Sequence, residues 1–351
     1  MSSGWADTLF SCHLRISPKG IGPADELSIP PLLLAMTGER RPLLVLFPTL
    51  AAAENALSAF RRWMTAAGRS CRVLLLPDGT RELRSASGTD CARAQALHQL
   101  LQEPPDILFA AVPAVLNPVP SVREMKKRSF TVRKGMTLSL MELARQLTEL
   151  DYDDELEVTV PGEFSKRGGL LDVFSPSGRQ PARIEFFGDE IESIRLFSPE
   201  SQRSTGEVEE YEIILRSGSG SELLEQGEIQ DYFKGWDPLL VPVFPETLRV
   251  QVERFSPDAL TRWESFPVAF GKNVCPLYDE PGTALHPEAQ TPPFFAMHGQ
   301  LMKALPKGGE KAFSDLGKSH FNIKNCTSLV LFYSIPKGRN LCFDSFPDFS
   351  T

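Results

Sequence analysis

The Gly188-Asp189 pair, in the stretch ARIEFFGDEIESIR from Ala182 to Arg195, most constrains how this chain can fold. Apolar and polar residues alternate on both sides of the pair, which is typical of half-buried strands. A two-residue turn needs a positive φ, and glycine adopts it without steric cost. The sequence therefore predicts a β-hairpin with this register: Phe187 opposite Glu190, Phe186 opposite Ile191, Ile184 opposite Ser193 and Arg183 opposite Ile194.

This register divides the side chains between two faces of a sheet, because successive residues of a strand point to opposite sides. The predicted apolar face, which would pack on a core, consists of Ala182, Ile184, Phe186 and Ile191. The predicted polar face consists of Arg183, Glu185, Phe187, Glu190, Glu192 and Ile194. The register also places Arg195 on the apolar side, whereas Arg167 lies beside Gly168-Gly169 at the rim of the sheet.

Phe187 among these charged residues has two interpretations. An aromatic side chain ringed by arginine and glutamate is typical of a protein-binding anchor. Single exposed apolar residues also occur on sheet faces without any binding role. The pattern by itself leaves both interpretations open.

Upstream of the hairpin, buried strands alternate with amphipathic helices. Continuous apolar runs and helical periodicity predict this order: strand 42–48, helix 50–68, strand 71–77, helix 91–102, strand 106–112 and helix 138–150. Such alternation predicts a parallel sheet of the α/β class, whose strand ends often bind nucleotides. The glycines and serines of 216–222 predict a flexible joint.

Composition limits the possible partners. A net charge of -8 argues against a chain that grips nucleic acid by overall charge, so DNA contact would be local, as in the basic segment 121–135. That segment is also typical of a solvated surface. The six scattered cysteines favour reduced thiols over a zinc site. With neither a leader pattern nor a membrane-length apolar run, we expect a cytoplasmic protein without a membrane partner.

The segment 161–204 resembles the UvrB-interaction domain shared by the excision-repair protein UvrB and the transcription-repair coupling factors. The resemblance lies in GEF, RGG, LDVF, RIEFFGDEIESIR and the final QRS. The coupling factors are the closer of the two families, through the Asp151-Tyr152 step before PGEF and the SQRS end. Similarity extends over about 25–215 and, thinly, over 232–248.

This resemblance implies a division of the chain into three parts. Residues 1–150 would form a degenerate, P-loop-like α/β domain, and residues 151–216 an inserted small antiparallel β domain. Residues 217–351 would return to the α/β domain, to about residue 250, and continue into an unassigned region.

The resemblance also implies a partner. In these families the small domain docks onto UvrA, the damage-sensing ATPase of nucleotide excision repair. Matched position by position, the UvrA contacts fall on Arg167, Arg183, Phe187 and Glu190, and more weakly on Arg195. The implied function is an adaptor that recruits UvrA to stalled RNA polymerase. Polymerase and damaged DNA would be reached indirectly, through the full-length family.

At the position of the family's phosphate loop, GxxxxGK[ST], this chain has different residues. Gly38 is kept, but Glu39, Arg40 and Arg41 stand where the glycine, lysine and hydroxyl residue should be. Only Glu246 stands near the place of the family's acidic metal-binding pair. Phosphoryl transfer depends on these groups, so we expect no catalysis, no cofactor and no metal.

Three other interpretations stay open at this point. One is an enzyme, an ATP-dependent helicase component of the excinuclease complex like UvrB itself. Another is a DNA-binding module that acts through 121–135. The third makes Asp279-Glu280 a replacement acidic pair, although this pair precedes a proline and a glycine, as in an ordinary turn.

Overall fold

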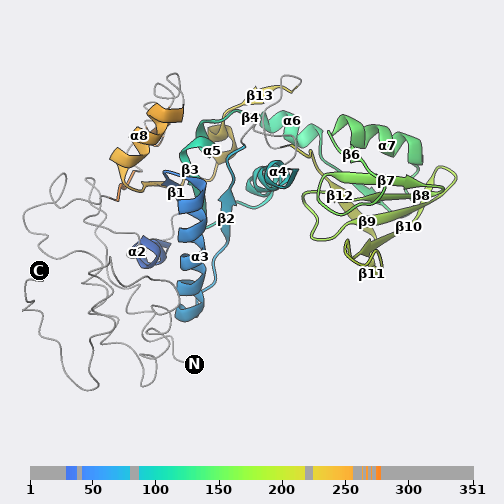
Figure 1. Cartoon of the computed structure of the whole chain (residues 1–351), viewed down its shortest axis with the longest axis horizontal. Helices are drawn as coiled ribbons and strands as arrows, with labels where there is room; N and C mark the ends of the chain where they lie inside the picture. The colour runs from blue at the N-terminus through green and yellow to red at the C-terminus, as the bar shows by residue number, and fades with distance from the viewer. Residues whose placement is uncertain are drawn as a thin grey trace, which may run out of the picture.

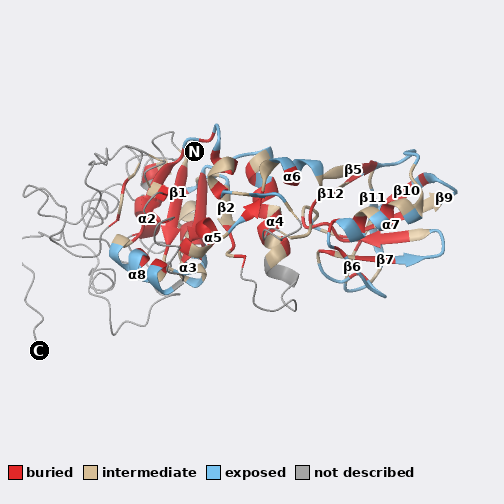
Figure 2. Ribbon diagram, turned by 90° about the horizontal axis from the view of Figure 1, so that it is seen from above, coloured by how far each residue is buried: buried red, intermediate tan, exposed pale blue. Residues whose placement is uncertain are grey.

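A computed structural model of the chain describes residues 29–37, 42–79, 87–217, 224–255, 263, 266–267, 270 and 274–277. These residues form two lobes, which we call the α/β lobe and the β lobe (Figure 1). Helices α4 (Ser87–Gln102) and α6 (Val122–Lys127) lie between the lobes in both views (Figures 1 and 2).

The α/β lobe is built on a four-stranded parallel sheet with the strand order β14-β1-β3-β2. Its strands are β1 (Leu43–Phe47), β2 (Val73–Leu76), β3 (Ile107–Ala111) and β14 (Leu239–Pro242). Every residue of the two central strands, β1 and β3, is buried, as is usual when both faces of a parallel sheet are covered. The predicted parallel sheet and its first three strands are confirmed.

Helix α3 (Leu50–Ala67) matches the helix predicted at 50–68 and is capped at both ends. The Thr49 hydroxyl accepts a hydrogen bond from the Ala52 N–H at 3.2 Å, and Gly68 closes the helix with φ +62°. Helix α4 begins at Ser87, before the predicted start at Cys91. The lobe also contains α2 (Ile29–Met36), α5 (Val112–Leu116) and α8 (Pro245–Phe255).

The β lobe is a six-stranded sheet with the strand order β11-β10-β9-β8-β7-β6. Its strands are β6 (Asp153–Asp154), β7 (Glu163–Arg167), β8 (Leu170–Val173), β9 (Ala182–Phe187), β10 (Glu190–Phe197) and β11 (Ser204–Glu207). All neighbours are antiparallel except β6 and β7. Helix α7 (Leu140–Glu149), within the predicted 138–150, packs on β7 and β8.

Short ribbons join the lobes. Strand β5 (Phe130–Arg133) pairs with β12 (Glu210–Ile213), and β4 (Val119–Pro120) pairs with β13 (Gln226–Gly227). His98 of α4 contacts Glu212 of β12, with 3.0 Å between His98 Nε2 and Glu212 Oε1. This hydrogen bond lowers the pKa of the Glu212 carboxyl. It ties a helix of the chain's first half to a strand that follows the hairpin.

One cluster of buried side chains runs through both lobes. It contains Leu44 and Leu108 of the parallel sheet, Leu97 of α4, and Ile184 and Ile191 of the β lobe. The apolar face of the hairpin is therefore continuous with the interior of the α/β lobe. Figure 2 shows buried residues along the whole length between the two sheets.

Candidate protein-binding face

The hairpin between β9 and β10 closes at the predicted turn. Gly188 has φ +63°, Phe187 pairs with Glu190, and Phe186 pairs with Ile191. The register then shifts by one residue between Ile191 and Ser193, so Glu192 is the extra residue of a β-bulge. The pairs predicted beyond this point are wrong: Ile184 lies opposite Ile194, and Arg183 lies opposite Arg195.

The bulge also corrects two predicted faces, because one extra residue reverses the alternation of every side chain after it. Ile194, predicted on the polar face, is fully buried in the core. Arg195, predicted on the apolar side, lies on the polar side with 46% of its side chain exposed. The prediction for Ala182, Ile184 and Ile191 is confirmed, since all three are buried.

Strand register assembles one polar face on the side of the sheet opposite the core, because residues directly across paired strands share a face. One row is Arg167, Leu170, Glu185 and Ser193; the next is Ser165, Asp172, Arg183 and Arg195; the hairpin end adds Phe187 and Glu190. We call these ten residues the polar face. It brings together all the residues predicted to contact a partner: Arg167, Arg183, Phe187, Glu190 and Arg195.

Asp172 lies at the centre of the polar face, between Ser165 and Arg183. Its carboxylate accepts two hydrogen bonds from the Arg183 guanidinium, each 2.8 Å long, and its side chain is 5% exposed. These bonds raise the pKa of Arg183 above its ordinary value. Arg167 approaches the same carboxylate at 4.0 Å. Arg183 thus donates through Nε and Nη2 to Asp172, whereas Arg167 keeps 53% of its side chain exposed.

A second charged group lies beside the first. Arg195 pairs with Glu185, and the Ser193 hydroxyl donates to the same carboxylate at 3.1 Å. This pair crosses from β10 to β9, the strand that also carries Arg183. The polar face therefore presents both signs of charge in fixed positions.

Phe187 is the most exposed aromatic side chain of this face, at 79%. It stands at the end of β9, directly before the turn, and pairs with the exposed Glu190. Its neighbour Phe186 points to the other side and packs against the core. A ring of this size left in water next to charged groups is the arrangement expected of a binding anchor.

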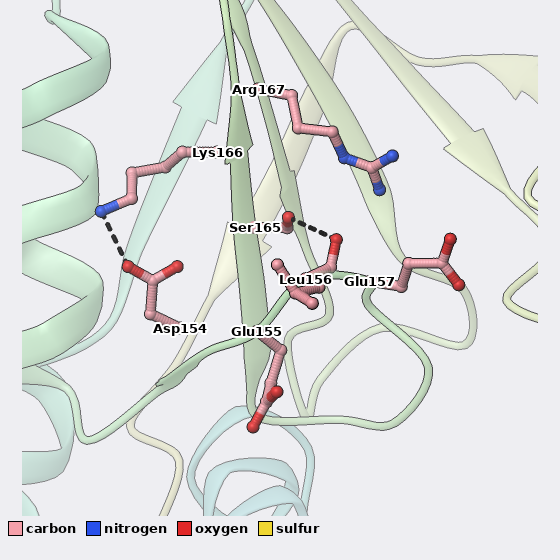
Figure 3. Close-up of a pocket in the computed structure, with 7 residues that line it drawn as sticks. All are labelled: Asp154, Glu155, Leu156, Glu157, Ser165, Lys166 and Arg167. Atoms are coloured by element: carbon pink, nitrogen blue, oxygen red, sulfur yellow. Dashed lines mark hydrogen bonds and ion pairs between the residues drawn. The ribbon is translucent and has the colours of Figure 1, made fainter.

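Beside Arg167, the loop after β6 and strand β7 enclose an open pocket of about 740 Å³ (Figure 3). Lys166 pairs with Asp154 at 2.8 Å, and the Ser165 hydroxyl donates to the Leu156 carbonyl at 3.1 Å. Leu156 is 89% exposed. Sequence reasoning missed this pocket, although a leucine inside the acidic run DYDDELE was a signal that could have pointed to it. Two glutamates complete its lining: Glu155 and Glu157.

The other end of the polar face is closed by a small apolar cluster that sequence reasoning also missed. It consists of Val158, Phe174 and Phe197, and the Arg183 guanidinium lies 4.8 Å from the centre of the Phe197 ring. The Gln202 amide donates to the Val158 carbonyl at 3.1 Å. The final QRS of the motif thus supports the loop that carries Val158.

Comparison with known proteins identifies the part of the chain that carries this face. Residues 130–217 match the UvrB interaction domain. This UvrB interaction domain contains every residue of the polar face, together with α7 and the β5–β12 ribbon. The resemblance drawn from the 161–204 motif is confirmed.

The chain is also similar to curated transcription-repair-coupling factors. It is 40% identical over 107 residues to that of Myxococcus xanthus, which covers 30% of this chain and 9% of the relative. For Bacillus subtilis the identity is 34% over 112 residues, covering 32% and 10%. For Escherichia coli it is 29% over 189 residues, covering 53% and 16%. The chain thus matches between 9% and 16% of the length of these relatives.

The basic segment 121–135 lies partly inside the UvrB interaction domain, and several of its cations have carboxylate partners. The ion pairs are Arg128 with Glu124 at 2.8 Å, Arg133 with Glu210 at 3.0 Å and Lys134 with Glu207 at 3.0 Å. Paired cations have less charge available for phosphates. The geometry therefore favours the solvated-surface interpretation of this segment.

The nucleotide and metal predictions fall largely on other parts of the chain. Gly38, Glu39, Arg40 and Arg41 lie outside the described residues, as do Asp279-Glu280 and residues 218–222 of the predicted joint. Glu246 lies in the first turn of α8. Within the described ranges, no group of three or more His, Cys, Asp or Glu residues could hold a metal ion. No helix in those ranges is long and apolar enough to cross a membrane.

Proposed function

We propose that this chain is an adaptor that recruits UvrA for nucleotide excision repair at RNA polymerase stalled on damaged DNA. The match to the UvrB interaction domain and the similarity to coupling factors support this proposal. The polymerase and the damaged DNA are proposed as indirect partners. The named relatives are coupling factors, so the alternative of a UvrB-like helicase component is not favoured.

The observation that carries the proposal is the exposed Phe187 ring on a polar face cross-linked by ion pairs. The opposite side of the same sheet is buried in the core, whereas Phe187 is 79% exposed, so core packing of the described residues does not account for its ring. Buried aromatic anchors surrounded by polar groups account for much of the binding energy in protein interfaces. Phe187 would fill a pocket on UvrA, and the charged residues would surround it.

The other predicted contact residues take different roles in this proposal. Arg167, which lies 4.0 Å from Asp172 and has 53% of its side chain exposed, and the exposed Glu190 can pair with charges on UvrA. Arg195 shares its charge with Glu185. Arg183, which is paired with Asp172, would mainly stabilise the arrangement of strands β8 and β9 under the polar face.

A titration of UvrA against the immobilised full chain tests the proposal. We expect Phe187→Ala to weaken binding about thirtyfold, because losing an aromatic anchor typically costs about 2 kcal/mol. Val250→Ala is the matched control, since Val250 is also an exposed apolar residue, at 45%, but lies on α8. Absence of UvrA binding by the unaltered chain, or equal binding by the Phe187 variant, would refute the proposal.

We further propose that residues 151–216 form the docking module and that residues 1–150, with 217 to about 250, form a scaffold that hydrolyses no nucleotide. The charged residues at Glu39, Arg40 and Arg41 support this part of the proposal, because a glutamate beside a triphosphate repels it. In this proposal UvrA docking depends only on the arrangement of residues on the polar face and requires no nucleotide hydrolysis.

A further inference from the structure

Leu156 is an exposed leucine in the loop between β6 and β7. Its side chain is 89% exposed, more than that of Phe187 at 79%. A single exposed leucine is common on protein surfaces and needs no explanation by itself. Leu156 differs because it lines the pocket of about 740 Å³ that Arg167 also lines. A partner that enters this pocket would cover the leucine.

Side-chain contacts hold this loop in place. The Ser165 hydroxyl donates to the Leu156 carbonyl at 3.1 Å. The Glu163 carboxylate accepts hydrogen bonds from the Thr159 and Val160 N–H groups, at 2.8 and 2.9 Å. A loop that is ordered before binding loses less conformational entropy when a partner covers it.

The loop lies on the same side of the sheet as the polar face. Ser165, whose hydroxyl bonds to the loop, belongs to the polar face by strand register. Val158 of the loop is buried in one cluster with Phe197, and the Arg183 guanidinium lies 4.8 Å from the centre of that ring. Two residues of the polar face thus border the loop and its anchoring cluster.

Arg167 connects the pocket to the hairpin end of the polar face. Figure 3 shows its side chain on the same side of β7 as Leu156. Strand register places Arg167 in one row with Leu170 and Glu185, and Phe187 follows two residues later on β9. With about 4.8 Å between strands and about 3.4 Å per residue, Arg167 and Phe187 lie roughly 12 Å apart. An interface that buries about 800 Å² on each partner is roughly 30 Å across, so it can cover both.

The charged groups of the pocket favour a basic occupant. Three carboxylates and two cations line it. Lys166 pairs with Asp154 at 2.8 Å. No dashed line in Figure 3 reaches Glu155 or Glu157, so neither pairs with another residue drawn there. A basic side chain on a partner would complement these two exposed carboxylates.

We infer that Leu156 is a second apolar anchor of the docking surface and that the pocket beside it receives a basic side chain of UvrA. This inference rests on the proposed function. The matching patch on UvrA carries an apolar residue against Leu156 and an arginine or lysine next to Glu155 and Glu157.

Titration of UvrA against the immobilised full chain tests this inference with two variants. We expect Leu156→Ala to weaken binding about tenfold, because it removes most of the apolar area that UvrA would cover. We expect Glu157→Lys to weaken binding by about the same factor, because it places like charges side by side. Leu156→Met keeps a similar apolar volume and should bind like the unaltered chain.

Two control variants change the same kinds of exposed residue on the α/β lobe. Val250→Ala on α8 and Glu54→Lys on α3 should bind like the unaltered chain. All five substitutions are at exposed positions, so we expect them to leave the melting temperature nearly unchanged.

The outcomes separate this inference from the proposed function. If Phe187→Ala weakens binding and either Leu156→Ala or Glu157→Lys binds like the unaltered chain, the inference is overturned and the proposed function stands. If the unaltered chain does not bind UvrA, both are overturned. Weakening by both variants, together with full binding by Leu156→Met and by the two controls, supports the inference.

Discussion

Arg183 and Arg167 both approach Asp172, but they differ in their distance from its carboxylate and in how much of each side chain is exposed. Arg183 makes both short hydrogen bonds and has 23% of its side chain exposed, whereas Arg167 stays at 4.0 Å. Resemblance to a family assigns both the same role, because it carries no information on exposure. A charge reversal at Arg183 would therefore disturb folding and binding together.

We expect Arg183→Ala to destabilise the chain by about 2 kcal/mol, because it leaves the buried Asp172 carboxylate without its main partner. The partial exposure of Arg183 keeps this cost below that of a fully buried pair. Urea unfolding, followed by circular dichroism, measures the change. Arg179→Ala is the control on an exposed arginine of the same domain, and an equal, small loss in both variants would contradict the expectation.

Phe187 was predictable and Arg195 was not, for a physical reason. Phe187 adjoins the turn, so its face depends only on the positive φ of Gly188. Arg195 lies beyond Glu192, where a bulge adds one residue. A bulge leaves little trace in the sequence. Strand β10 mixes apolar and polar residues, so either register, with or without Glu192 as an extra residue, places some of each on both faces.

At the scale of elements, two tight turns shape the polar face. One contains Gly168, with φ +60°, and the other Gly188, with φ +63°. Strands β7 and β9 run in the same direction, so Arg167 and Phe187 stand at the same end of the sheet. Turn residues thus decide where the exposed side chains gather.

We expect Gly188→Ala to destabilise the chain by about 1–2 kcal/mol, because a Cβ disfavours the left-handed backbone. Gly206→Ala is a matched control. A Cβ at either glycine would meet nothing within 4 Å, and Gly206 has no positive φ. Thermal melting of both variants checks the expectation, which fails if the two melt at the same temperature.

The predictable elements were those with a strong pattern. Buried strands such as β1 and β3 and the capped helix α3 followed from apolar runs and periodicity. Strand β11 has four exposed residues and no alternation, so only its pairing with β10 makes it a strand. The pocket at Leu156 likewise depends on a loop whose path is set by distant hydrogen bonds, such as that from Gln202.

At the scale of the whole molecule, the α/β lobe has the parallel sheet that often binds nucleotides, yet we propose it as a scaffold. We expect millimolar ATP with magnesium to leave the melting temperature unchanged, since a ligand stabilises a protein only by binding its folded state. A P-loop ATPase in the same buffer is the positive control. A clear rise in melting temperature would contradict the proposal and favour the helicase alternative.

The shared core has a mechanical consequence. Ile184 and Ile191 behind the polar face belong to the same packed cluster as Leu97 of α4 and Leu44 of the parallel sheet. Closely packed interiors have low compressibility and transmit strain. A force that a bound protein applies to the hairpin would therefore be transmitted through this packed cluster into the α/β lobe.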